Sequence, residues 1–288
     1  MRAQIKSACW SGVTLLILSG CGMGTSTSSS GMSSDCGSGL SSKSCLSWVS
    51  MTGGSFNMGT SANASYKEPD ELPAHQVTIG TFEILKTEVT INQFKACVKA
   101  GSCTAPLAYS TDVNSQDHWC NWNVPARDNH PVNCVDWDQA AAFCQAAGGR
   151  LPSEAEWEFA ARDGGKEVTF PWGDAAADCT RANMKDPQTN IQGCGDISTH
   201  AVCKASAGIP ASGLCDMAGN VYEWVKDWYH NSYQNAPADG SAWETPVGAT
   251  RVRRGGSWAN PDVGLRASNR TFDPPTAQIN AVGFRCVR

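Results

Sequence analysis

The cysteines constrain the fold of this chain more than any other feature. The 288-residue sequence contains 14 of them, and its first 20 residues resemble a secretory leader, which directs the remainder to a compartment where disulfides form. Cys9 lies in that leader and Cys21 directly follows it. Twelve cysteines remain: Cys36, Cys45, Cys97, Cys103, Cys120, Cys134, Cys144, Cys179, Cys194, Cys203, Cys215 and Cys286. No C-x-x-C pair occurs, so zinc-ribbon and thioredoxin sites lack their spacing, and we predict a disulfide framework.

The connectivity of this framework does not follow from the sequence alone. Two pairs are close in the sequence and bounded by polar segments, which makes them candidates: Cys97 with Cys103, and Cys120 with Cys134. Cys36 and Cys45 could close a further short loop where order begins.

The amino terminus has the pattern of a bacterial lipoprotein. Residues 1–20 carry two basic residues and then a short apolar run, which is too short to persist as a spanning helix. Leu18-Ser19-Gly20-Cys21 resembles a lipobox, so we expect cleavage before Cys21 and lipidation of that cysteine. The alternative is an ordinary signal peptide followed by an incidental cysteine. Because Gly22 follows Cys21, the pattern indicates an exported protein anchored in the outer membrane.

Composition divides the mature chain into a tether and one domain. Residues 21–45 are mostly Ser, Gly and Thr and cannot bury enough apolar surface to fold. Residues 46–288 supply the core, since 41% of the chain is hydrophobic. Without the leader, 20 basic residues face 27 acidic ones, which argues against nucleic acid as a partner.

Local signals predict three helices and several short strands. Each helix has an N-cap with a reciprocal partner three residues later: Thr90 with Gln93, Asp136 with Gln139, and Ser153 with Glu156. Glycines end them at Gly101, Gly148 and Gly164. Short β-like runs lie between long loops: Gly54–Met58, Gln76–Ile79, Val252–Arg254 and Phe284–Val287. We interpret the 11 tryptophans first as core residues.

One stretch combines turn residues, carboxylates and large aromatics. Asp216, Gly219 and Asn220 favour a sharp bend, and the aromatic run Tyr222–Tyr229 favours burial. Asp216 and Glu223 bracket the bend, which is the arrangement of a hard-cation site. The alternative is a structural turn whose Glu223 pairs with an arginine.

This stretch also carries a family resemblance. Asp216–Trp224 (DMAGNVYEW) resembles the signature of the formylglycine-generating enzyme family, also called the sulfatase-modifying-factor family. Further runs agree with that family in the expected order: His130–Val132 leading to Trp137, Gly149–Glu158, Arg254–Trp258 and Gly283–Cys286. The resemblance covers Ser47 to Arg288 and implies a single irregular α+β domain of the C-type-lectin-like fold, rich in disulfides and poor in regular secondary structure.

The resemblance further implies one disulfide and structural calcium. The matching positions are bridged in the family between Cys144 and Cys286. One calcium ion is expected at the side chains of Asp216 and Glu223 with the carbonyls of Gly219 and Val221. A second is expected at Asn183, the Met184 carbonyl and Asp196.

Resemblance to the family's oxidases ends at their metal centre. Those enzymes convert a cysteine of a client sulfatase to formylglycine with a pair of copper(I)-binding cysteines, which follow the Gly-Gly-Ser-aromatic motif. Here Asn260 stands where the first of the pair is expected, and no cysteine occurs between Cys215 and Cys286. Sulfoxide-forming relatives need a histidine cluster, whereas the five histidines are scattered: His75, His118, His130, His200 and His230. We expect no bound copper and no oxidase activity.

Two functional hypotheses follow. The first is a membrane-anchored module that retains the fold as a scaffold for binding a protein, a peptide or a glycan. The second is a divergent metal-dependent oxidoreductase of this family that acts on a protein or a small molecule.

Overall fold

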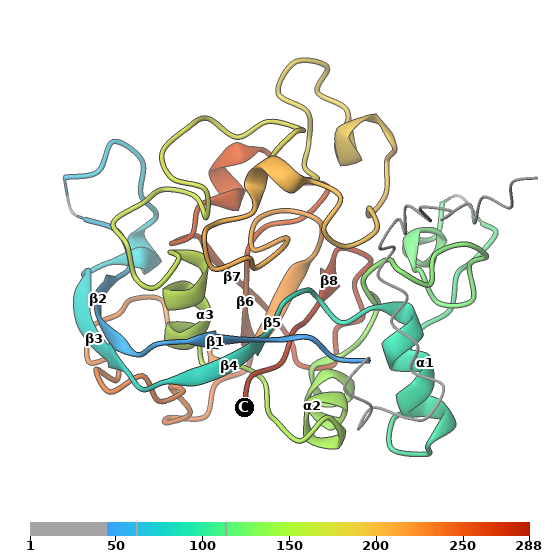
Figure 1. Ribbon diagram of the computed structural model, residues 1–288, viewed down its shortest axis with the longest axis horizontal. Coiled ribbons are helices and arrows are strands. Elements are labelled where there is room, and N and C mark those ends of the chain that lie inside the picture. Colours follow the sequence, from blue (N-terminus) through green and yellow to red (C-terminus); the bar gives the residue numbers. More distant parts are fainter. Residues whose placement is uncertain (1–44, 62, 113) are drawn as a thin grey trace, which may run out of the picture. The chain divides into compact units, whose positions relative to one another are not determined.

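A computed structural model describes residues 45–61, 63–112 and 114–288. Within these ranges, which belong to one compact unit, the chain forms short strands, three α-helices and long loops (Figure 1). The expected leader, the lipidation site at Cys21 and the tether up to Ser44 lie outside the described residues. Cys36, the suggested partner of Cys45, lies outside them too.

The three predicted helices are present with the predicted N-caps. α1 (Ile91–Lys99) follows Thr90, α2 (Trp137–Ala146) follows Asp136, and α3 (Glu154–Ala161) follows Ser153. In each case the N-cap side chain accepts from the amide three residues later, and the side chain there accepts from the N-cap amide. These reciprocal bonds satisfy amides that a helix leaves unpaired, so local chemistry sets where each helix begins.

Two antiparallel strand pairs form the amino-terminal part of the domain. β1 (Trp48–Met51) pairs with β4 (Phe82–Leu85), and β2 (Gly54–Met58) pairs with β3 (His75–Ile79). In β2 the side chains of Phe56 and Met58 are buried and that of Asn57 is exposed, which is the alternation of a half-buried strand. Figure 1 shows β2 and β3 beside α3.

A four-stranded sheet lies at the centre of the described domain, in the order β7-β6-β5-β8. It contains β5 (Tyr222–Trp228), β6 (Arg251–Arg254), β7 (Arg270–Asp273) and β8 (Val282–Gly283). β5 is antiparallel to β6 and parallel to β8. The stretch that the sequence marks as a turn followed by aromatics therefore leads into an inner strand.

The strand predicted at Phe284–Val287 is wrong in its bounds. Regular pairing covers β8 only, and Val287 makes isolated bridges with two other segments. The residues between are held by their side chains, because Arg285 pairs with Glu223 and Cys286 is in a disulfide. These side-chain bonds replace a regular ladder.

Buried aromatic residues supply much of the core. Phe94 of α1, Phe143 of α2 and Phe284 pack together, with ring centroids 5.5 to 6.3 Å apart. Trp157 and Trp224 are fully buried. For these two tryptophans the interpretation as core residues is confirmed.

Every cysteine in the described part of the chain is disulfide-bonded. The three expected pairs are present, together with two that the sequence analysis left unassigned: Cys97–Cys103, Cys120–Cys134, Cys144–Cys286, Cys179–Cys194 and Cys203–Cys215. Cys144–Cys286 joins α2 to the last segment across 142 positions of sequence. Closing a loop of that length is worth about 5 kcal/mol in the chain-entropy model.

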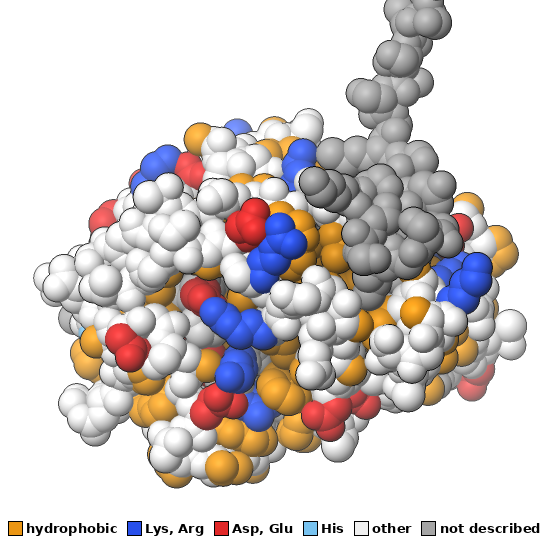
Figure 2. Space-filling model, turned by 60° about the horizontal axis from the view of Figure 1, so that its bottom comes forward, with side chains coloured by type: hydrophobic (Ala, Val, Ile, Leu, Met, Phe, Trp, Pro, Cys, Tyr) orange, Lys and Arg blue, Asp and Glu red, His pale blue; other side chains and the backbone are white. Residues whose placement is uncertain are grey.

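Charges of both signs mix on the surface. Figure 2 shows Lys and Arg side chains next to Asp and Glu side chains on one face. Surface ion pairs include Arg288 with Glu83 and Lys226 with Glu244. Among the described helices, none has the length and apolar character needed to cross a bilayer.

Candidate functional site

The turn before β5 is fixed by backbone conformation and backbone bonds. Asp216, Gly219 and Asn220 have φ angles of 55°, 83° and 60°. A Cβ at Gly219 would lie 2.4 Å from the carbonyl oxygen of Asn183, so only glycine fits there. The Asn220 amide donates to that same carbonyl at 2.8 Å. The bend that the sequence predicts is therefore present, and these contacts fix its backbone conformation.

Glu223, just beyond the turn, forms a buried ion pair with Arg285. Its Oε1 accepts from Nη2 and its Oε2 from Nε of the guanidinium, both at 2.7 Å. The indole N–H of Trp157 also donates to Oε2, at 2.8 Å. The structure thus contains the arginine partner that the sequence analysis held as the alternative to a metal.

Two more buried carboxylates lie near this pair. Glu88 accepts from the side chain of Asn220 and the backbone of the turn, and Asp216 accepts from the Cys203 amide at 2.6 Å. Burial raises the pKa of Asp216 to about 6. Burial, together with the charges of Asp216 and Glu223, raises the pKa of Glu88 well above its usual value. Three carboxylates therefore surround the single positive charge of Arg285.

The first expected calcium site has the charge that suits a cation, but one of its expected ligands, Glu223, is already engaged. The excess of negative charge around Arg285 would favour a further cation at the turn. Both oxygens of Glu223 already accept hydrogen bonds, however, and no group of three His, Cys, Asp or Glu side chains in the described ranges is arranged to hold a metal. Calcium at Asp216, Gly219, Val221 and Glu223 would have to share Glu223 with Arg285, and it stays a prediction.

The residues expected at a second calcium ion differ in their burial and in their partners. The Oδ1 atom of Asn183 is buried without a hydrogen-bond partner, as an ion ligand would be. The Met184 carbonyl already accepts a backbone amide. The Asp196 carboxylate is 59% exposed and contacts His200 and Lys204. Asn183 therefore has an oxygen without a hydrogen-bond partner, whereas Asp196 already contacts two basic side chains, and the second calcium ion stays a prediction.

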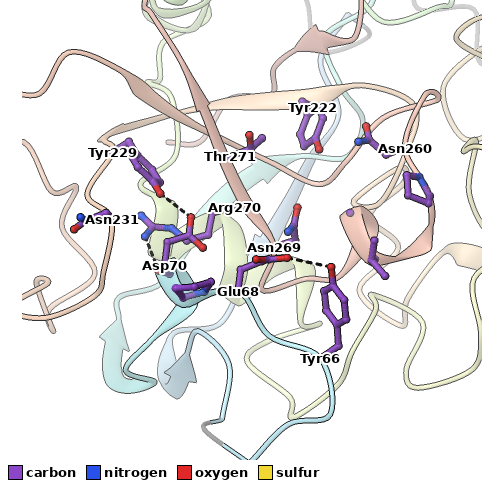
Figure 3. Close-up of a pocket in the computed structure, with 14 residues that line it drawn as sticks. Tyr66, Glu68, Asp70, Tyr222, Tyr229, Asn231, Asn260, Asn269, Arg270 and Thr271 are labelled. Atoms are coloured by element: carbon purple, nitrogen blue, oxygen red, sulfur yellow. Dashed lines mark hydrogen bonds between the residues drawn. The ribbon is translucent and has the colours of Figure 1, made fainter.

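An open cavity of about 650 Å³ lies beside the central sheet (Figure 3). Its walls come from residues 66–70, 260–264 and 269–271, together with Tyr222, Tyr229 and Asn231. The Tyr66 hydroxyl donates to Glu68 at 3.0 Å, and the Tyr229 hydroxyl donates to Asp70 at 2.9 Å. Polar groups therefore converge on a space of the size that small ligands or side chains occupy.

Asn260 forms part of the opposite wall of this cavity (Figure 3). Its Oδ1 accepts from the Ser257 hydroxyl at 2.5 Å. An amide fixed in this way offers hydrogen bonds but no thiolate. The position where the resemblance implies a copper-binding cysteine thus faces the cavity with a neutral side chain.

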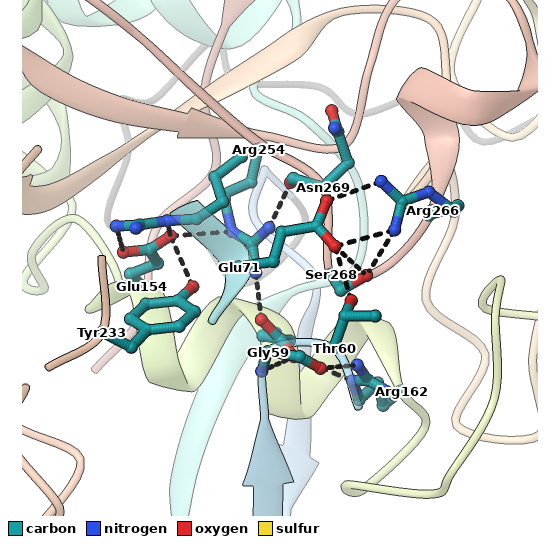
Figure 4. Close-up of polar contacts among 12 residues, drawn as sticks. Gly59, Thr60, Glu71, Glu154, Arg162, Tyr233, Arg254, Arg266, Ser268 and Asn269 are labelled. Atoms are coloured by element: carbon teal, nitrogen blue, oxygen red, sulfur yellow. Dashed lines mark hydrogen bonds and ion pairs between the residues drawn. The ribbon is translucent and has the colours of Figure 1, made fainter. Parts of the chain in front are cut away.

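Buried arginine–carboxylate pairs hold the cavity walls in place (Figure 4). Arg266 binds Glu71 at 2.5 and 2.9 Å, and Arg270 binds Glu154 at 2.7 and 2.8 Å. A third carboxylate, Glu158, pairs with Arg254 and with Arg162. Arg270 also donates from Nη1 to the Asp70 carbonyl at 2.8 Å, so an arginine of one wall is bonded directly to the backbone of another.

Comparison with known proteins identifies the family. The sequence profile of the sulfatase-modifying factor enzyme 1-like domain matches residues 38–288. The chain belongs to the sulfatase-modifying factor family. It is 32% identical over 277 residues to the formylglycine-generating enzyme of Streptomyces coelicolor, covering 83% of this chain and 88% of that one.

Two further relatives of the sulfatase-modifying factor family bear on fold and activity. The inactive C-alpha-formylglycine-generating enzyme 2 of Mus musculus is 30% identical over 280 residues, covering 83% of this chain and 84% of that one. The structure of PvdO from Pseudomonas aeruginosa superposes with a TM-score of 0.70 at 30% identity, covering 86% of this chain and 95% of that one. The expected family and the irregular α+β fold are confirmed.

Sequence reasoning identified Asn260 but missed most of this family member's cavity. Tyr66, Glu68 and Asp70 were not singled out, and Tyr229 was interpreted only as a core aromatic. One signal was available, since Tyr66–Asp70 (YKEPD) is a proline-containing acidic run with no helical or strand pattern, as ligand-contacting loops often are.

Glu71→Gln tests the buried pairs that hold the cavity. Burial alone would raise the pKa of Glu71, but Arg266 and Thr60 lower it overall. A lowered pKa stabilises the folded state above about pH 4.3, and this contribution is lost as the pH falls. We expect Glu71→Gln to lower the free energy of unfolding at pH 7 by about 3 kcal/mol. The difference in unfolding free energy between the variant and the wild type should become smaller below about pH 4.

Urea unfolding between pH 3 and pH 7 measures both effects. Glu83→Gln is the matched control, because Glu83 pairs with Arg288 at the surface and should cost less than about 1 kcal/mol. If both variants lose the same amount of unfolding free energy, the buried pair contributes no more to stability than an exposed pair does.

Calcium at the turn is tested by melting. Asp216→Ala is the suitable variant, because it removes the side-chain oxygen, whereas Glu223→Ala would also leave Arg285 buried without a partner. We expect calcium at about 100 times its Kd to stabilise the wild type by about 2.7 kcal/mol and Asp216→Ala by much less. Asp112→Asn, in an exposed loop, should respond as the wild type does. If chelator leaves the wild-type melting curve unchanged and no calcium co-purifies, calcium does not bind at this turn. Arg285 would then be the cation that pairs with its carboxylates.

Proposed function

We propose that this protein is a membrane-anchored member of the sulfatase-modifying factor family that binds a ligand in the cavity beside Asn260 and does not oxidise cysteine. The ligand would be a protein, a peptide or a glycan. The observation that carries the proposal is the cavity wall itself, where Asn260 is hydrogen-bonded in place of a thiolate.

Cysteine chemistry supports the loss of the oxidase centre. Every cysteine in residues 45–61, 63–112 and 114–288 is held in a disulfide. Copper(I) is a soft ion that proteins bind with thiolates or thioethers, and a disulfide sulfur cannot replace them. The mouse relative whose name describes it as inactive shows that members of this family are known without the oxidase activity.

The retained cavity supports a binding role. Its volume of about 650 Å³ is in the range of ligand sites, and tyrosine, carboxylate and amide groups line it. The network of Arg266, Glu71, Arg270 and Glu154 holds those walls together. A site that is kept in shape without the metal ligands of an oxidase suits recognition of a ligand.

The absence of formylglycine-generating activity is tested directly. The purified full chain is incubated with copper(I), oxygen and a Cys-x-Pro-x-Arg peptide, and peptide mass is followed by mass spectrometry. We expect no aldehyde, since binding alone cannot replace the metal centre. The Streptomyces coelicolor relative, under the same conditions, is the positive control. Aldehyde formation by this chain would reject the proposal and favour the divergent oxidoreductase.

Anchoring through Cys21 is tested by fractionation in a bacterium that processes lipoproteins. We expect the wild type in the outer-membrane fraction and Cys21→Ser in the soluble fraction, because one thiol carries the lipid. Cys9→Ser is the matched control, since Cys9 leaves with the leader, and it should fractionate as the wild type does. The lipid anchor would be rejected if the mass of the wild-type protein included no lipid, or if Cys21→Ser remained in the membrane fraction.

A further inference from the structure

A second cavity, of about 360 Å³, lies just beyond the carboxyl end of α3. Its walls come from three segments, 163–168, 171–173 and 207–211, and none of its lining residues belongs to the cavity beside the central sheet. We call it the α3 cavity. Its volume is at the lower end of the range of small-ligand sites, so the α3 cavity suits one ring of a small molecule better than a folded segment of a protein.

Trp172 presents the carbon surface of its ring to the α3 cavity. Its indole stacks on Phe170, with ring centroids 5.1 Å apart and ring planes 8° apart, and its N–H donates to the Ala175 carbonyl at 2.9 Å. Phe170 is buried and Trp172 is half-buried. Because the N–H is already bonded and one ring face is stacked, Trp172 offers an aromatic surface in a fixed orientation.

The turn that carries Trp172 is closed by its own backbone. The amides of Phe170 and Gly173 each donate to the carbonyl of the other residue, at 3.0 and 2.9 Å. Pro171 and Trp172 form the tip of this turn, and proline fixes one of its backbone angles. An aromatic surface that is held in place before binding lowers the entropic cost of ordering it around a ligand.

The wall at 207–211 is tied to the end of α3. Asp163 accepts from the Ser212 amide at 2.8 Å, and the Cys203–Cys215 disulfide closes the loop that contains this wall. Two of the three segments around the α3 cavity are therefore joined by a bond that includes Asp163.

The charged side chains of the α3 cavity form an ion pair with each other. Lys166 donates to Oδ2 of Asp163, and the Ser212 amide donates to Oδ1. Burial alone would raise the pKa of Asp163, but these bonds lower it overall, so the carboxylate is ionised at neutral pH. A carboxylate accepts about four hydrogen bonds and an ammonium donates three. Both groups thus retain capacity for a ligand, although their charges cancel.

This combination of groups selects among classes of ligand. A charged ligand would have to compete with one member of the ion pair, whereas a hydroxyl group can donate to a carboxylate or accept from an ammonium. A proline-rich peptide suits an aromatic surface, but its prolines have no N–H to donate to Asp163. A pyranose ring has a C–H face, which suits the negative face of an indole, and adjacent hydroxyls that suit both charged groups.

We propose that the α3 cavity binds a pyranose ring of a neutral saccharide, with the ring stacked on Trp172 and adjacent hydroxyls bonded to Asp163 and Lys166. This site goes beyond the proposed function, which concerns the cavity beside Asn260, and neither proposal depends on the other.

Saturation-transfer NMR of the full chain tests the class of ligand. The probes are maltose, cellobiose and N,N′-diacetylchitobiose, with sorbitol as a polyol without a ring and acetyl-hexaproline-amide as the peptide. We expect at least one disaccharide to bind with a Kd of about 10 mM or tighter, and at least about tenfold more tightly than sorbitol, because only a ring has a face to stack. The inference is overturned if no disaccharide binds, if sorbitol binds equally well, or if the peptide is the tighter ligand.

Variants locate the bound saccharide. Trp172→Ala should weaken its binding at least about tenfold. The matched control is Trp243→Ala, which removes another half-buried indole that is stacked on a ring and lines neither cavity. Lys166→Met should weaken binding about fivefold, because it removes a hydrogen-bond donor. Its control is Lys95→Met, which breaks a different ion pair at the surface. Both controls should bind as the wild type does.

Two further comparisons keep the test decisive. Lys166 is exposed, so Lys166→Met reports on the site even if Trp172→Ala does not fold. Tyr66→Ala alters the cavity beside the central sheet and should leave saccharide affinity unchanged. Equal affinity of Lys166→Met and Lys95→Met, or a loss of affinity in Tyr66→Ala, would reject the α3 cavity as the saccharide site. The copper assay of the proposed function does not involve these titrations, so each proposal can fail alone.

Discussion

The buried pair of Glu223 and Arg285 is the interaction on which the rest of the described structure depends. It lies where the turn before β5, the indole of Trp157 in α3 and the last segment of the chain meet. Arg285 also donates to the carbonyl of Cys215 at 2.8 Å. A buried pair gains little net stability over apolar side chains, but removal of one partner leaves a charge without compensation. The main effect of the pair is therefore to specify how these three segments are arranged, and its net contribution to stability is smaller.

The same logic extends to the other buried arginines, and it explains how so irregular a chain remains compact. Long loops carry backbone polar groups and little apolar surface, so they need other means to be held. Here Arg266 binds Glu71 across 195 positions of sequence, and Arg270 binds Glu154 across 116. Disulfides hold further loops, such as the one closed by Cys203 and Cys215. Ion pairs and disulfides thus hold loops in place that a larger β-sheet holds in more regular folds.

What the sequence predicted well was local. The N-caps Thr90, Asp136 and Ser153 each act on amides within three residues, so their effect could be deduced without the fold. The bend at Gly219 could be deduced for the same reason. The family resemblance then gave the overall fold, because several short motifs agreed in order.

Long-range pairing could not be deduced in the same way. Nothing in the neighbourhood of Glu223 indicates Arg285 in place of any other arginine, so this ion pair could not be deduced before the two residues were seen together. The strand predicted at Phe284–Val287 failed for a related reason. All four residues are buried, and Arg285 and Cys286 bind distant partners that no local pattern contains.

The cavity shows how these pairs and the chemistry of the site are connected. Asp70 and Glu71 are adjacent in the sequence, yet Glu71 is buried against Arg266 while Asp70 faces the cavity with only a tyrosine hydroxyl on its carboxylate. The pairing of Glu71 fixes the backbone from which Asp70 projects, and the pairing of Arg270 with Glu154 removes the cation that would otherwise neutralise Asp70. The exposure of the Asp70 carboxylate to the cavity is therefore a consequence of the same arginine pairs that hold the loops.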